Sequence, residues 1–101
     1  MPLKPTTEQA LQRLRLDSDL GDDVKDAIDQ AHGQAVKYLD GPLVEVINAD
    51  SDPKAVLCTP DIIAAQLLLV DVLVGANDVK AQESKRAAAY SMLRPHRNQG
   101  A

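Results

Sequence analysis

Hydrophobic residues recur every three or four positions in several stretches of this chain, which is the spacing of amphipathic helices. The pattern predicts helices over residues 7–16, 22–39, 60–75 and 79–93. Residues typical of helix ends support these boundaries. Thr6 and Gln9 have the spacing of a capping box before the first helix, and Pro60 occupies the first position of the third. Gly41 and Pro42 end the second helix.

The third helix is apolar on almost every side between Ile62 and Val74, where Gln66 and Asp71 are the main polar interruptions. A helix of this kind must be covered on all sides. A chain of 101 residues buries only about 60 to 65% of its unfolded surface, so the other helices must wrap this one. We therefore expect a mainly α fold: residues 1–101 form one small four-helix domain around a central apolar helix, with little material left for a catalytic cleft.

Residues 43–58 are rich in β-prone side chains on both sides of a turn-forming stretch at 48–53. This composition predicts an extended arm or a long hairpin between the second and third helices. Its apolar residues outnumber what a local hairpin needs. We therefore expect subunit contacts through Val44, Val46, Ile47 and Val56.

Charge is unevenly distributed along the chain. The net charge is −4, yet residues 80–101 carry five basic side chains against Glu83 alone. Pro95 stops the fourth helix, and residues 95–101 are expected to form a mobile tail. Because this basic segment lies where the fourth helix stops, we expect Arg94, His96 and Arg97 to reach toward a partner.

Chemistry-bearing residues do not assemble into a recognisable motif. The acidic residues from Asp17 to Asp23 lack the spacing of a calcium loop. His32, Cys58 and His96 lack a fourth ligand and a zinc-site spacing. We therefore expect no metal, no cofactor and no enzymatic activity, although an enzyme using Cys58 as a nucleophile remains one alternative.

A second alternative is a small helical DNA-binding or regulatory protein, which the basic last quarter of the chain supports. The acidic isoelectric point near 4.9 argues against this reading, because a DNA-binding surface must neutralise phosphates. The apolar run is shorter than the roughly 20 residues that cross a bilayer, and no signal peptide is evident. With a single cysteine, these features predict a protein of the cytoplasm in which it is made, without membrane contact.

Four segments in this order resemble the head-tail connector family of tailed bacteriophages, also called head-completion or DNA-packaging adaptor proteins. They are TEQALQRLRLD at 7–17, AVKYL at 35–39, PDIIAAQLLLV at 60–70 and MLRPHR at 92–97. The third resembles the buried helix of that family, and the fourth resembles its closing "leucine, any, proline, aromatic, arginine" signature. His96 stands where the family commonly has an aromatic residue, and residues 72–75 lack its usual Tyr and Arg.

The resemblance implies a structural virion protein at the neck between head and tail. About twelve copies would form a ring below the portal, extend the DNA channel, and provide the platform for a stopper or tail-completion protein. Genomic DNA would pass through without sequence-specific binding. The basic residues Arg94, His96 and Arg97 would then face the portal.

Overall fold

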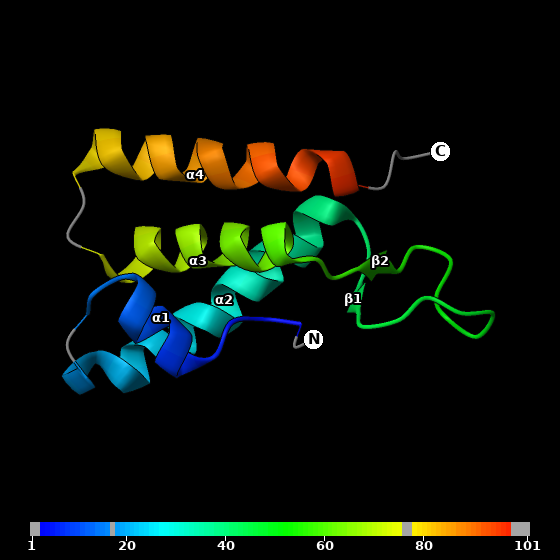
Figure 1. Ribbon diagram of the computed structural model, residues 1–101. Coiled ribbons are helices and arrows are strands. Elements are labelled where there is room, and N and C mark those ends of the chain that lie inside the picture. Colours follow the sequence, from blue (N-terminus) through cyan, green and yellow to red (C-terminus); the bar gives the residue numbers. More distant parts are fainter. Residues whose placement is uncertain (1–2, 17, 76–77, 98–101) are drawn as a thin grey trace.

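The computed structural model describes residues 3–16, 18–75 and 78–97. Its elements are α1 (Thr7–Arg13), the 3-10 turn η1 (Ser18–Leu20), α2 (Gly21–Leu39), β1 (Leu43–Val44), β2 (Val56–Leu57), α3 (Pro60–Val74), α4 (Val79–Leu93) and the 3-10 turn η2 (Arg94–His96). Figure 1 shows α3 in the middle, with α4 along one side and α2 crossing on the other. The prediction of a small, mainly helical domain is confirmed.

Local hydrogen bonds mark the start of α1 and the end of α2. At α1, Thr6 Oγ1 accepts from the Gln9 amide at 3.1 Å and the Thr6 amide donates to Gln9 Oε1 at 3.0 Å, which confirms the capping box. The α2 helix ends before the predicted Gly41-Pro42 signal. Asp40 adopts the left-handed conformation there (φ 58°), which Asp tolerates better than most residues. Its amide donates to the Val36 carbonyl.

The central helix α3 is buried along most of its length. Its buried side chains and those of α2 make up most of the core: Val24, Ala27, Ile28, Ala31, Ala35, Leu39, Ile62, Ala65, Leu67, Leu69 and Val70. Ala89 and Leu93 of α4, Ala10 of α1, and Leu43, Val56 and Cys58 near the strands complete it. Coverage of α3 is nevertheless incomplete. Ile63, Ala64 and Leu68 are half-buried and Leu73 is 40% exposed. The expectation that the whole helix is wrapped therefore holds for most of its length and fails at two places: beside α1, where Ile63 and Ala64 line a groove, and at its last turn, where Leu73 lines a hollow next to α2.

The arm, residues 43–58, is not a hairpin. Its two short strands run parallel, with Leu43 opposite Val56 and Val44 opposite Leu57. The Val56 amide donates to the Pro42 carbonyl at 2.8 Å and the Cys58 amide to the Val44 carbonyl at 2.9 Å. A hairpin requires antiparallel strands, whereas parallel strands need a long connection. Residues 45–55 provide that length, so composition indicated the strands and the turn without fixing their relative direction.

Several parts of the sequence predictions fall outside the described residues. These are Asp17 in the turn before α2, Ala76 and Asn77 before α4, and residues 98–101 of the expected tail. The helix that follows the second of these gaps, α4, begins as predicted: the Asp78 side chain accepts from the Ala81 amide at 2.7 Å, which is an N-cap bond.

Candidate functional site

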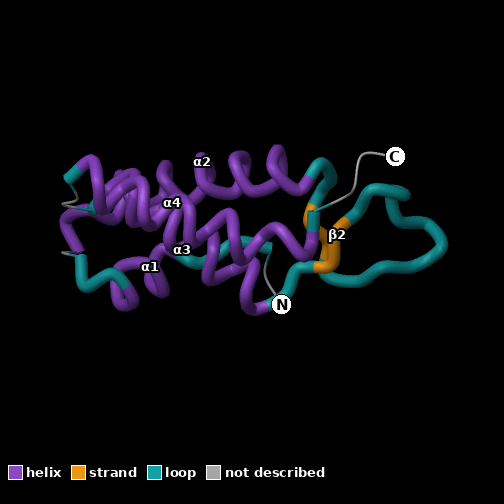
Figure 2. Tube along the Cα trace, turned by 90° about the horizontal axis from the view of Figure 1, so that it is seen from above, coloured by secondary structure: helices purple, strands orange, loops and turns teal. Residues whose placement is uncertain are grey.

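Two neighbouring exposed hydrophobic residues lie on the loop of the arm, residues 45–55. This loop projects beyond the helices at one end of the molecule (Figures 1 and 2), whose longest dimension is 42 Å against 26 and 18 Å for the others. Val46 is 65% exposed and Ile47 is 56% exposed. Two neighbouring β-branched residues held away from their own core form an apolar surface that a partner can bury.

Internal hydrogen bonds give the loop a defined shape. Asn48 Oδ1 accepts from the Asp50 amide at 2.9 Å, and the Ser51 amide donates to the Asn48 carbonyl at 3.1 Å. Further along, Asp52 Oδ1 accepts from the Lys54 amide at 2.8 Å. The bonds accepted by Asn48 Oδ1 and Asp52 Oδ1 are turns that Asn and Asp side chains make with nearby backbone, and the Ser51 bond is a backbone turn. The composition of residues 48–53 predicted a turn, and the structure confirms it.

The four residues predicted to form a subunit interface separate into two groups. Val46 and Ile47 are exposed on the loop, whereas Val44 is half-buried and Val56 is only 7% exposed at the base of the arm. The assignment of Val56 is therefore corrected. Side chains alternate along a strand, so Val56 points into its own core while Leu57, 43% exposed, points outward.

The carboxy-terminal turn η2 is held against the domain, which corrects the expectation of a mobile tail beginning at residue 95. His96 Nε2–H donates to Oδ2 of Asp61 at a distance of 2.6 Å, and Asp61 belongs to the first turn of α3. The Arg97 guanidinium lies 5.0 Å from the centre of the Tyr38 ring, within cation–π range. His96 and Arg97, both predicted to contact a portal, thus make contacts inside the domain. The third residue, Arg94, is exposed.

Asp61 links the start of α3 to this turn. The Thr59 hydroxyl donates to one oxygen of the Asp61 carboxylate and His96 donates to the other, and both bonds lower the pKa of Asp61 below its ordinary value near 3.8. A carboxyl group whose pKa is lower in the folded chain stabilises the fold above its unfolded pKa. That contribution is lost as the pH falls through the folded pKa.

We therefore expect Asp61→Asn to make the free energy of unfolding depend less on pH in the acid range. The wild type should exceed the variant in free energy of unfolding near pH 6, and the difference should shrink between about pH 4 and pH 2. Urea unfolding across this range measures it. As a control, His96→Ala should raise the pKa of Asp61 in an NMR titration. Parallel stability profiles for wild type and Asp61→Asn would contradict the assignment.

The two polar interruptions of α3 both find partners. Gln66 is fully buried; its Nε2 donates to the Leu3 carbonyl at 3.0 Å, and its Oε1 lies 3.2 Å from His32 Nδ1. Because the Leu3 carbonyl only accepts, Gln66 Oε1 must face His32, whose Nδ1 therefore carries the hydrogen. Asp71 pairs with Lys85 of α4 at 2.5 Å. The sequence marked both positions as unusual but gave no sign of their partners.

The Cys58 thiol does not have the features of a nucleophile. It is 5% exposed, and its Sγ lies 3.8 Å from the Leu3 carbonyl oxygen. Burial raises the pKa of this thiol, which disfavours the reactive thiolate. Within the described residues, no three His, Cys, Asp or Glu side chains gather as a metal site requires. None of the helices in that part of the chain is both long and apolar enough to cross a membrane.

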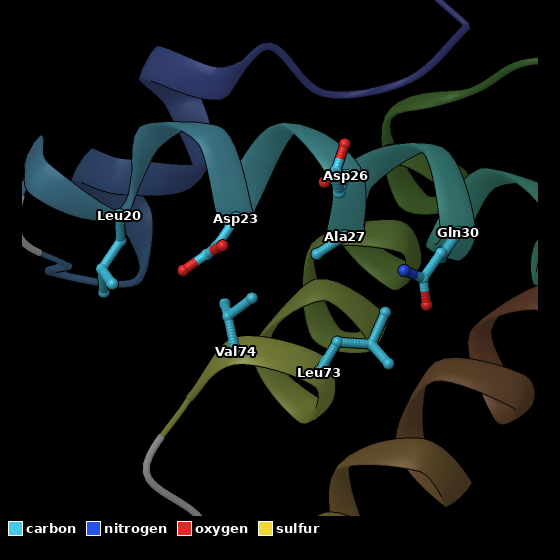
Figure 3. A pocket seen from close by; sticks show the side chains of 7 residues that line it. All are labelled: Leu20, Asp23, Asp26, Ala27, Gln30, Leu73 and Val74. Atoms are coloured by element: carbon cyan, nitrogen blue, oxygen red, sulfur yellow. The ribbon is translucent and has the colours of Figure 1, made fainter.

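A hollow of about 450 Å³ separates the first half of α2 from the last turn of α3. Figure 3 shows Asp23 and Gln30 of α2 on one side and the aliphatic Leu73 and Val74 of α3 on the other, while Asp26 points away from Leu73. Among its lining residues the titratable groups are Asp23 and Asp26, with no histidine, cysteine, serine or lysine beside them. We assign this hollow no chemistry.

Comparisons of this chain with known protein families, with curated proteins and with solved structures find no match.

Proposed function

We propose that this protein is a ring-forming head-tail connector subunit of a tailed bacteriophage. In this role, copies of the chain join around the DNA channel below the portal and offer a platform to a stopper or tail protein. The observation that carries the proposal is the arm: it presents Val46 and Ile47, 65% and 56% exposed, on a loop beyond the helices. A surface of this kind suits contact with a neighbouring subunit.

The charge of the chain supports the same role. A net charge of −4 disfavours tight binding to phosphates and favours passage of DNA past the protein. Arg94 is exposed and directly follows α4. Figure 1 shows that this end of α4 lies on the same side of the molecule as the arm. The portal contact proposed for Arg94 would therefore lie close to the subunit contact proposed for the arm.

Charging the arm tests the proposal. We expect Val46→Asp combined with Ile47→Asp to abolish ring formation, because each charge would have to be desolvated in the contact. Negative-stain electron microscopy and sedimentation of the protein with its portal measure rings, and circular dichroism should show unchanged helicity. The matched control is Val79→Asp, since Val79 is 71% exposed at the start of α4, far from the arm in Figure 1. Rings that form equally well from the doubly charged variant would refute the proposal.

One observation favours a second candidate, a small DNA-binding or regulatory protein. Gln34, Lys37, Tyr38, Arg86 and Tyr90 line a hollow of about 480 Å³, and the two tyrosine rings lie 4.7 Å apart. Cationic side chains beside aromatic rings are used by proteins that hold single-stranded nucleic acid. Anisotropy of a labelled oligonucleotide, single- or double-stranded, distinguishes the candidates: binding that weakens between about 50 and 200 mM salt would favour this one.

A further inference from the structure

A groove between α1 and α3 exposes apolar surface of the central helix. It is lined by Pro60, Ile63, Ala64 and Leu67, which share one face of α3, and by Gln9 and Arg13 of α1. Ile63 and Ala64 are half-buried in it. The groove has a volume of about 170 Å³, and a cavity of about 150 Å³ is large enough to hold benzene. A valine or isoleucine side chain is smaller than benzene and would therefore fit in it.

The groove and the arm have complementary charge as well as matching apolar character. Arg13 lies exposed at the groove and makes no ion pair within the described residues. On the arm, Glu45 directly precedes Val46 and is also exposed without an ion pair in that part of the chain. An acidic residue followed by two exposed aliphatic residues thus matches an apolar groove with a basic side chain at its edge.

We propose that the arm of one copy inserts Val46 or Ile47 into the α1–α3 groove of a second copy, with Glu45 against Arg13. This inference rests on the proposed function, because it names the receiving surface for the subunit contact suggested there. The loop of the arm projects away from the helices of its own copy (Figure 2), which leaves it available to another. Because the inserting and receiving surfaces differ, the contact is heterologous and repeats from copy to copy, as a ring requires.

A charge exchange tests the ionic part of the contact. Arg13→Glu alone and Glu45→Arg alone should each weaken the contact between two copies about tenfold, the effect of roughly 1.4 kcal/mol on one association step, and so reduce ring yield. The double variant should recover most of the lost ring formation, because the ion pair is restored with its charges exchanged. Ring yield on the portal is measured by sedimentation. Failure of the double variant to recover would overturn the pairing of Glu45 with Arg13.

Disulfide trapping tests the insertion itself. In a Cys58→Ala background, Val46→Cys and Ala64→Cys are combined, and the protein is oxidised alone and on the portal. We expect a ladder of linked dimers, trimers and larger species, whereas the control pair Val79→Cys with Ala64→Cys should give none. Monomers linked internally, dimers only, or no product in either condition would overturn the proposal.

The outcomes separate this inference from the proposed function. If the variant with Val46→Asp and Ile47→Asp forms no rings, while the ladder and the charge rescue are both missing, the arm contacts a surface other than the groove. The connector role then stands and the groove assignment fails. If the wild type forms no rings on the portal but gives the ladder, the copies associate through the groove and the connector role fails.

Discussion

Replacing Leu69 with alanine is expected to lower the free energy of unfolding by about 3 to 4 kcal/mol. Leu69 is 1% exposed and belongs to the core formed by α2, α3 and α4. The substitution removes apolar contacts and leaves a cavity that the surrounding helices fill only in part. A domain of this length has a total stability of roughly 5 to 15 kcal/mol, so urea unfolding followed by circular dichroism should show a large shift.

Leu73→Ala is the matched control for this prediction. It makes the same change on the same helix, but Leu73 is 40% exposed, so we expect a loss below about 1 kcal/mol. Equal losses at the two positions would show that the exposed face of α3 contributes as much to stability as its buried face. That result would contradict the burial described for the central helix.

The second large effect is expected at Gln66. Gln66→Leu keeps similar bulk but removes the bonds to the Leu3 carbonyl at 3.0 Å and to His32 at 3.2 Å. A buried polar group that loses its partner costs about 1 to 3 kcal/mol, so we expect a loss of about 2 kcal/mol. The segment from Leu3 to Thr6 should also lose protection in hydrogen exchange, because Gln66 ties that segment to α3.

The control for Gln66 is Gln30→Leu on α2. Gln30 is exposed, and a surface substitution of this kind changes stability by less than about 0.5 kcal/mol. Adding His32→Ala to Gln66→Leu should cost less than the sum of the two single losses, because the substitutions remove one shared bond. Simple additivity would indicate that Gln66 and His32 act independently.

The helices could be predicted from the sequence because their signals are local. The Thr6 capping box and Pro60 each lie within one turn of the helix end that they mark, and α4 has the predicted bounds of 79 and 93. The excess of apolar residues in the arm was also visible, since it depends on residue type alone. Both features rest on interactions between residues close together in the chain.

The remaining features join residues far apart in the chain, which periodicity does not encode. Gln66 bonds to Leu3 across 63 positions and His96 to Asp61 across 35. The parallel direction of β1 and β2 depends on how the ends of α2 and α3 are arranged in space. The α1–α3 groove likewise exists only once α1 has docked, so the receiving half of the proposed contact had no signal in the sequence.

The parallel strands at the base of the arm also determine how its loop is joined to the helices. Backbone bonds from Val56 to Pro42 and from Cys58 to Val44 clamp both legs of the arm together. One leg follows the end of α2 after residues 40–42, and the other leads through residues 58–59 into the first turn of α3. The same pair of strands therefore joins the loop of the arm to the ends of two core helices, so a contact made by the loop is one short connection away from both of them.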